Sequence, residues 1–202
     1  MLRYLTSKGL RKDAGGVKSL TDEDVENVEK GIANVIYSKN KLSLYPRIYG
    51  SVWEYYIYTK TGYANDQSLS QRIEFAKAAF TIIKHNLWFG VGTGNWRDEF
   101  VNAYQENKSG LGEKYYSSSH NQYLNYLVKF GITGFLMILF FLVYPVIRTK
   151  RYHDPYFFIF LVLIIFSNFA DSNLESHMGS SFFVFFYCLF LITDGIDYLR
   201  LK

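Results

Sequence analysis

Residues 130–147 form an uninterrupted apolar stretch, FGITGFLMILFFLVYPVI, without a charged side chain. A helix of this length rises by about 27 Å, which nearly crosses the roughly 30 Å hydrocarbon core of a membrane. Two shorter stretches, residues 156–170 and 180–193, are equally apolar. Buried helices of a soluble core are an alternative, but a small soluble domain rarely hides three such stretches in succession. The sequence therefore predicts an all-α integral membrane protein with about three transmembrane helices.

The charged turns between these stretches predict the topology. The turn after the first stretch, RTKRYHDP, holds three basic residues beside the membrane, and such an excess favours the cytoplasmic side. The segment DSNLESHMG, residues 171–179, is then external, and the chain ends in the cytosol with residues 194–202. By the same alternation we expect residues 1–129 to form an external helical loop domain, followed by a transmembrane part, residues 130–202.

Charge and composition exclude several other classes. The net charge of +4 is spread among acidic and basic residues, so no nucleic-acid surface is predicted. The single cysteine, Cys188, can form neither a disulfide within the chain nor a cysteine-based metal cluster. The first residues, MLRYLTSKGLRKDAGG, lack the apolar core of a secretory signal. A transporter is poorly supported because the apolar stretches contain no central ionisable side chain.

Two features mark the first part of the external half. Thr21 and the three acidic residues after it predict the start of a helix, because a hydroxyl cap and early carboxylates satisfy the free amides there. Apolar residues at helical spacing continue this pattern to Ile36. The next stretch, SLYPRIYGSVWEYYIYTKTGY, is rich in aromatic residues. It indicates an interfacial structural belt or, less favoured, a sugar-stacking surface.

Two more helices are predicted before the membrane. The first covers residues 68–87, with Ser70 as a candidate cap, and ends in WFGVGTGNW, whose three glycines allow tight turns. A nucleotide-binding loop is a weak alternative, since no strand precedes these glycines and no helix clearly opens after them. The second is expected to start near His120, capped by Ser118 or Ser119, and to run into the first apolar stretch.

Four segments in a fixed order carry a further signal. They are RIEFAKAAFTIIKHNLWFGVGTGNW, then SSSHNQYLNYLVKFGITGFL, then the basic turn, then DSNLESHMGSSFFVFF. Over residues 68–193 this combination resembles the O-antigen ligase and O-antigen polymerase superfamily. The resemblance implies the C-terminal part of a GT-C-like polytopic fold in the bacterial inner membrane, with residues 1–129 in the periplasm.

The resemblance also implies an activity. Members are metal-independent, inverting glycosyltransferases without a cofactor, and their donor is a glycan on undecaprenyl pyrophosphate. The acceptor hydroxyl lies on lipid A core or on another glycan, in the biosynthesis of lipopolysaccharide and other cell-surface polysaccharides. Both a ligase and a polymerase stay open as interpretations.

Carried over by residue, the resemblance places the catalytic base at His120 and the donor pyrophosphate-binding cation at Arg72. The chemistry suits both, because a neutral imidazole can take a hydroxyl proton near neutral pH and a guanidinium forks onto phosphate oxygens. A helix-capping histidine and an interfacial arginine are the structural alternatives. Four further residues are candidates for an acceptor-side or structural role: Asn121, Asp171, Glu175 and His177. A metal site at the last three is disfavoured because their spacing lacks a ligand pattern.

Members of this superfamily have further transmembrane helices before the large loop. We therefore expect a truncated or partial chain, with a missing N-terminal transmembrane half as one partner. The alternative function is a non-catalytic membrane remnant or a partner-binding subunit, in which the aromatic transmembrane helices bind another bundle.

Overall fold

The computed structural model describes residues 1–38 and 44–192, and within these ranges it contains helices and no strands. The helical part of the prediction is therefore confirmed. The chain divides into two compact units, Met1–Lys60 and Thr61–Lys202. Some predicted features lie outside the described residues. These are residue 43, the first of the aromatic stretch, residue 193, the last of the third apolar stretch, and the predicted cytosolic tail, residues 194–202.

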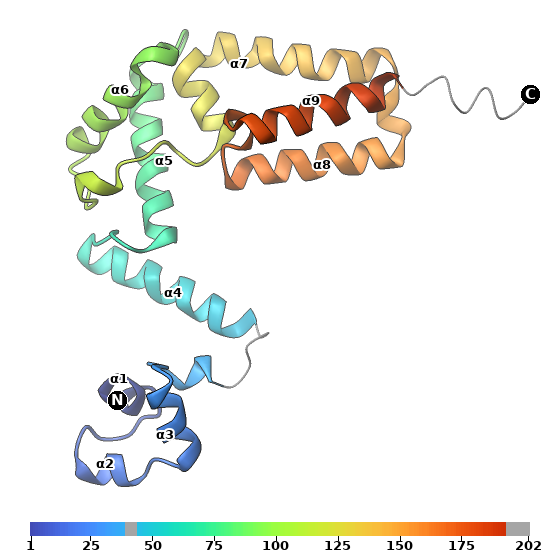
Figure 1. The fold of residues 1–202 in the computed structure, drawn as a ribbon. Helices are drawn as coiled ribbons and strands as arrows, with labels where there is room; N and C mark the ends of the chain where they lie inside the picture. Colours follow the sequence, from blue (N-terminus) through green and yellow to red (C-terminus); the bar gives the residue numbers. More distant parts are fainter. Residues whose placement is uncertain (39–43, 193–202) are drawn as a thin grey trace, which may run out of the picture. The chain divides into compact units, whose positions relative to one another are not determined.

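The first unit is built from short helices and one long one (Figure 1). In chain order they are α1 (Leu2–Ser7), α2 (Ala14–Lys18), α3 (Asp22–Glu29), the 3-10 helix η1 (Val35–Tyr37) and α4 (Leu44–Thr61). The aromatic stretch forms α4, a helix that the sequence analysis did not predict. Many of its aromatic side chains are exposed, among them Tyr45, Trp53, Tyr55 and Tyr56.

Helix α3 starts as predicted, with Thr21 and Asp24 forming a reciprocal capping box. Asp24 is buried and also accepts hydrogen bonds from Lys8 Nζ at 2.5 Å and Tyr4 Oη at 2.8 Å, and the Lys8 contact contributes most to lowering the pKa of Asp24. The predicted continuation to Ile36 is wrong. Gly31 adopts φ 77°, and the amides of Gly31 and Ile32 bond the Val28 and Asn27 carbonyls, which closes the helix.

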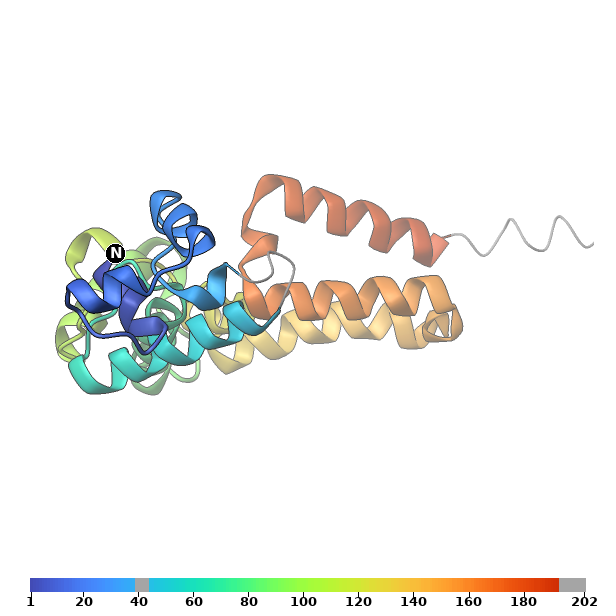
Figure 2. The same ribbon diagram turned by 90° about the horizontal axis from the view of Figure 1, so that it is seen from below.

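The second unit begins with a polar helical part and continues with three apolar helices (Figure 1). The polar part contains α5 (Ser68–His85), α6 (Gly92–Glu106) and the 3-10 helix η2 (Glu113–Tyr115). The apolar part contains α7 (Gln122–Arg148), η3 (Arg151–His153), α8 (Pro155–Ala170), η4 (Asn173–Glu175) and α9 (His177–Ile192). Helices α5 and α6 pack on each other and on α7, while α8 lies beside both α7 and α9 (Figure 2).

Three predictions about how the helices of this unit begin are wrong. Helix α5 begins after Gln67, so Ser70 lies inside it, buried, and is not its cap. Helix α6 opens at Gly92, within the glycine segment that was expected to lead into no helix. The side chain of Asn121 caps α7 by accepting hydrogen bonds from the amides of Tyr123 and Leu124. Ser119 cannot cap α7 because its buried hydroxyl donates to Asn125 Oδ1 at 2.7 Å.

Two glycine backbones cross where the turn after α5 meets α7. Gly131 has φ 62° and ψ −171°, which interrupts the helical geometry of α7. A Cβ at Gly131 would lie 2.4 Å from the Trp88 carbonyl carbon, and one at Gly90 would lie 2.5 Å from that of Lys129. The Ile132 amide donates to the Leu87 carbonyl at 2.8 Å, and the Val91 amide to that of Val128 at 2.9 Å. This glycine crossing fixes the polar helices to the start of α7.

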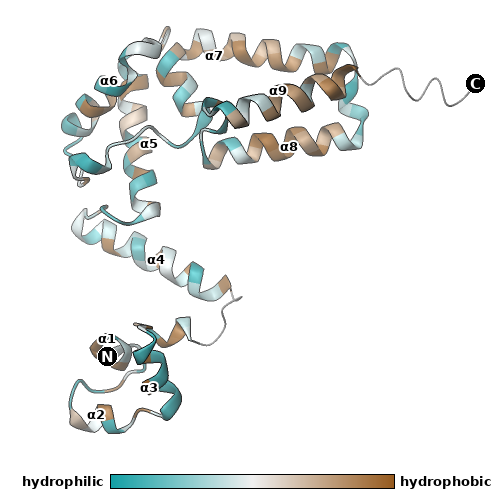
Figure 3. Cartoon of the chain, in the orientation of Figure 1, coloured by the Kyte–Doolittle hydropathy of each residue, from teal (hydrophilic) through white to brown (hydrophobic). Residues whose placement is uncertain are grey.

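Helix α7 is long and apolar enough to cross a membrane, whereas α8 and α9 are apolar helices of 16 residues each. Figure 3 shows the hydrophobic colouring gathered on these three helices. Their shared core contains Val146, Phe157, Phe183 and Tyr187. Many other large apolar side chains on the three helices are exposed, and a surface of that kind is typical of a face covered by lipid or by another protein.

Candidate active site

His120 lies in the turn that leads into α7, one residue before the Asn121 cap. Its φ of 47° is in the left-handed region, which non-glycine residues seldom adopt, although histidine does so more readily than most. The ring packs against Phe75 of α5, with ring centroids 5.4 Å apart. The packing on Phe75 holds the imidazole in place, and the exposed 41% of the side chain makes it accessible.

The two ring nitrogens of His120 have different neighbours. Nδ1 lies 3.2 Å from Oδ1 of Asp171, the residue directly after α8, and Nε2 lies 3.1 Å from Ser117 Oγ. Hydrogen bonding from the Ser172 amide contributes most to lowering the pKa of Asp171, and the contacts with His120 and the charge of Arg72 lower it further. An ionised Asp171 favours the tautomer with the proton on Nδ1, so the Nε2 lone pair can accept a hydrogen bond from Ser117 Oγ or a proton from a hydroxyl in its place.

Arg72 lies in the first turns of α5 and is exposed. Its Nη1 donates to the carbonyl of Ala170, the last residue of α8. The structure therefore brings Arg72, His120 and Asp171 to one place, although they come from three separate segments of the sequence. A cation, an imidazole and a carboxylate gathered on an exposed surface can bind an anion and move a proton.

Amide side chains at the start of α7 position the segment that holds Asp171. Asn121 Nδ2 donates to the Phe169 carbonyl at 3.1 Å, and Asn125 Nδ2 donates to Ser172 Oγ at 2.7 Å. Gln122 Oε1 accepts from the Leu174 amide at 2.9 Å. Asn121 is thus placed in a supporting role, beside the imidazole in sequence and bonded to the end of α8.

The structure does not bring Glu175 and His177 to His120. Glu175 accepts from Lys129 Nζ at 2.7 Å, and that ammonium also lies over the ring of Trp96. His177 Nδ1 lies 3.3 Å from Ser181 Oγ on its own helix. In the part of the chain that the structure describes, no group of three or more His, Cys, Asp and Glu side chains is placed to hold a metal ion.

Ser117 and Tyr104 belong to the site but were not predicted from the sequence. The Tyr104 hydroxyl donates to the Ser117 carbonyl at 2.6 Å, and its ring stacks on Tyr116 with centroids 4.3 Å apart. Burial raises the pKa of Tyr104, so the hydroxyl keeps its proton for this bond. The three-serine run before His120 is the only local signal, and it does not say which serine faces the imidazole.

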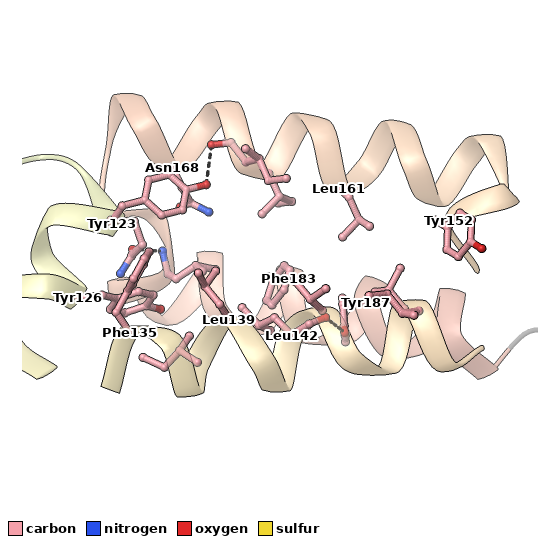
Figure 4. A pocket seen from close by; sticks show the side chains of 18 residues that line it. Tyr123, Tyr126, Phe135, Leu139, Leu142, Tyr152, Leu161, Asn168, Phe183 and Tyr187 are labelled. Atoms are coloured by element: carbon pink, nitrogen blue, oxygen red, sulfur yellow. Dashed lines mark hydrogen bonds between the residues drawn. The ribbon is translucent and has the colours of Figure 1, made fainter. Parts of the chain in front are cut away.

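An apolar cavity of about 340 Å³ lies among α7, α8 and α9. Figure 4 shows Tyr123 and Asn168 at one end of it and Tyr152 at the other. Buried Gln122 Nε2 and Asn168 Oδ1, from two residues that line the cavity, have no hydrogen-bond partner among the described residues. Gln122, two residues after His120 in the sequence, is among the lining residues, and the rest of the cavity lies between the apolar helices.

The fold and the site define a class, namely a helical protein whose His, Asp and Arg cluster lies at one end of a set of apolar helices. The family model of O-antigen ligases matches residues 29–139, which is more than half of the chain and includes Arg72 and His120. The chain therefore belongs to the O-antigen ligase family, and this confirms the predicted membership. Proteins of this family are integral to membranes and act in polysaccharide biosynthesis. None of the curated proteins and none of the solved structures matches the chain.

Proposed function

We infer that this protein transfers a glycan from undecaprenyl pyrophosphate to an acceptor hydroxyl on lipid A core or on another glycan. The observation that carries this inference is the imidazole of His120, held by Asp171 and facing an accessible surface beside the Arg72 cation. A general base and a phosphate-binding cation are the two groups that this reaction needs most.

The reaction balances with these groups alone. The acceptor oxygen forms a bond to the anomeric carbon while the bond from that carbon to the diphosphate oxygen breaks, and the electron pair leaves with the diphosphate. His120 Nε2 takes the acceptor proton, and the nearby Asp171 carboxylate stabilises the imidazolium that forms. Attack from the face opposite the leaving group inverts the anomeric configuration. No metal ion is required in this scheme.

Arg72 would stabilise the departing diphosphate. Its side chain is exposed, and among the described residues its hydrogen bond to Ala170 occupies one of five guanidinium N–H groups. The remaining donors can fork onto phosphate oxygens, where negative charge develops as the bond breaks.

The apolar cavity supports a lipid-linked donor. Its lining is almost entirely apolar, it lies among the three apolar helices, and it includes Gln122, two residues after His120. An isoprenoid chain of the donor would fit such a lining. In this arrangement α7, α8 and α9 span the bacterial inner membrane and residues 1–129 face the periplasm. The basic residues Arg148, at the end of α7, and Lys150 and Arg151, in the turn before α8, support a cytosolic position for that turn.

The first test is substitution of Arg72 in the chromosomal gene, with transfer from undecaprenyl-pyrophosphate-linked glycan measured in the bacterium's own membranes. We expect Arg72→Gln to lower transfer by about 10²- to 10³-fold. Glutamine keeps a polar side chain at this position and removes the charge. Arg72→Lys should keep more activity than Arg72→Gln, because it keeps a cation without the fork.

The products of the same assay separate the alternatives. A ligase attaches the glycan to lipid A core, whereas a polymerase lengthens the carrier-linked glycan. Unchanged transfer in Arg72→Gln membranes would contradict the proposed role of Arg72. Unchanged transfer in membranes lacking the chain would favour the non-catalytic, partner-binding alternative.

Asp171 provides a second test. Because its pKa lies below the ordinary value, the ionised carboxylate stabilises the fold at pH above that ordinary value, and this contribution is lost as the pH falls through the lowered one. We expect Asp171→Asn to lower kcat by roughly 10- to 100-fold. Asp98→Asn, at an exposed position on α6, is the control, and an unchanged kcat for Asp171→Asn would indicate a purely structural carboxylate.

A further inference from the structure

A second hollow lies between α6 and the segment before α7. It has a volume of about 280 Å³, and its walls include Trp96, Arg97, Tyr116, Ser117 and Ser118. We call it the Trp96 hollow. Its lining differs from that of the apolar cavity because it contains a guanidinium and two serine hydroxyls as well as aromatic rings.

The walls of the Trp96 hollow are held by packing. The ring of Tyr116 stacks on Tyr104, which is buried and bonds the Ser117 carbonyl. Trp96 meets the buried Phe100 edge to face, with centroids 6.1 Å apart, and Lys129 Nζ lies 4.7 Å from its ring centroid. Arg97 Cζ also lies 5.2 Å from the Trp96 ring centroid, so a ligand would meet a packed surface of aromatic rings and guanidinium, which lowers the ordering cost of binding.

Ser117 joins this hollow to the proposed base. It is a wall residue, and its Oγ lies 3.1 Å from His120 Nε2. The other ring nitrogen, Nδ1, lies beside Asp171, and the charge of Arg72 contributes to lowering the pKa of that carboxyl group. The proposed base nitrogen is therefore next to a wall residue of the Trp96 hollow, while Asp171 lies at the other ring nitrogen, on the side where Arg72 would bind the donor diphosphate.

The lining chemistry selects a carbohydrate. The C–H faces of a sugar ring pack against aromatic rings, while its hydroxyls accept from guanidinium N–H groups and exchange hydrogen bonds with serine hydroxyls. The volume is at the small end of ligand pockets, which suits a single ring of a longer glycan.

We propose that the Trp96 hollow binds the terminal sugar ring of the acceptor, so that the hydroxyl to be glycosylated takes the position of Ser117 Oγ at His120 Nε2. This inference rests on the proposed function, because it names the acceptor side of the same site. It assigns Trp96 and Arg97 to acceptor binding and gives them no part in donor binding.

The chain contains three tryptophans, which allows a direct binding measurement. In the Trp53→Phe/Trp88→Phe variant, Trp96 is the only fluorescent tryptophan. The probe is the core oligosaccharide released by mild acid from the bacterium's own lipopolysaccharide, and the second probe is undecaprenyl pyrophosphate without glycan. We expect a saturable change in Trp96 emission with the oligosaccharide and none with the lipid diphosphate. The matched Trp96→Phe variant, which keeps the other two tryptophans, should not respond.

Kinetics in native membranes provide the second readout. We expect Trp96→Ala and Arg97→Ala each to raise the acceptor KM about tenfold, with the donor KM unchanged. Arg97 is exposed, so its truncation should leave the fold intact. Trp88→Ala, at a tryptophan that is 64% exposed and lies outside the hollow, is the control and should behave as the unsubstituted protein.

Three results would overturn the acceptor assignment: an unresponsive Trp96 emission, an unchanged acceptor KM in both variants, or a raised donor KM. These outcomes differ from failure of the proposed function itself. That function fails when transfer survives the loss of His120, whatever the tryptophan variants show. If His120 is essential and the acceptor KM is unaffected by Trp96→Ala and Arg97→Ala, only the Trp96 hollow is assigned wrongly.

Discussion

Glycan transfer in membranes carrying His120→Ala is expected to fall by about 10²- to 10⁴-fold, the usual contribution of a general base. The loss should appear in kcat, because the imidazole acts on the hydroxyl proton as the new bond forms. Neither Ser117 nor Asp171, its polar neighbours, can replace it. A serine hydroxyl is too weak a base, and the lowered pKa of Asp171 makes its carboxylate a poor proton acceptor.

Two control variants separate this chemistry from the backbone strain at the same position. His120→Asn keeps a residue type that tolerates the left-handed region, yet its amide cannot accept a proton near neutral pH. We expect it to be as inactive as His120→Ala while unfolding at the temperature of the unsubstituted protein. His85→Ala, on the exposed face of α5, should retain full transfer. Activity in His120→Asn close to that of the unsubstituted protein would remove the imidazole from the mechanism.

The largest expected effect on stability comes from Gly131→Ala. The backbone of Gly131 lies in a region that is almost restricted to glycine, and an added Cβ would lie 2.4 Å from the Trp88 carbonyl carbon. Backbone strain and overpacking together should cost more than about 3 kcal/mol. For a chain of this size that corresponds to a fall in unfolding temperature of about 6–12 °C, measured in detergent micelles by circular dichroism.

Gly94→Ala is the matched control for this prediction. Gly94 lies within α6, has no positive φ, and a Cβ there would meet nothing within 4 Å. Its replacement should leave the unfolding temperature unchanged or raise it slightly, because alanine favours the helix. Equal unfolding temperatures for Gly131→Ala and the unsubstituted protein would contradict the glycine crossing as described.

The sequence predicted the features that depend on local chemistry. The start of α3 follows from the reciprocal bonding of Thr21 and Asp24, three residues apart, and the apolar stretches follow from composition alone. The family was also predicted from ordered motifs, and the family match confirms it. Helix ends were less accessible, because the turn at Gly31 overrides an apolar spacing that continues beyond it.

The spatial partners of the site were beyond sequence reasoning. Asp171, Glu175 and His177 are close neighbours in the chain and formed one candidate group. The fold separates them, since Asp171 contacts His120 while Glu175 pairs with Lys129. Ser119 was a plausible helix cap until tertiary packing engaged its hydroxyl with Asn125. Such choices depend on which segments meet, and no periodicity encodes that.

His120 and Asp171 lie at the ends of two different apolar helices. His120 comes just before α7 and Asp171 just after α8, so the 3.2 Å contact between them depends on how far one helix slides or tilts along the other. Helix α8 has 16 residues and a length of about 24 Å, shorter than an average hydrocarbon core. In the proposed orientation, a thicker bilayer would change the tilt or the relative position of the two helices. If His120 and Asp171 act together as proposed, the lipid chain length of the membrane would then affect the distance between them.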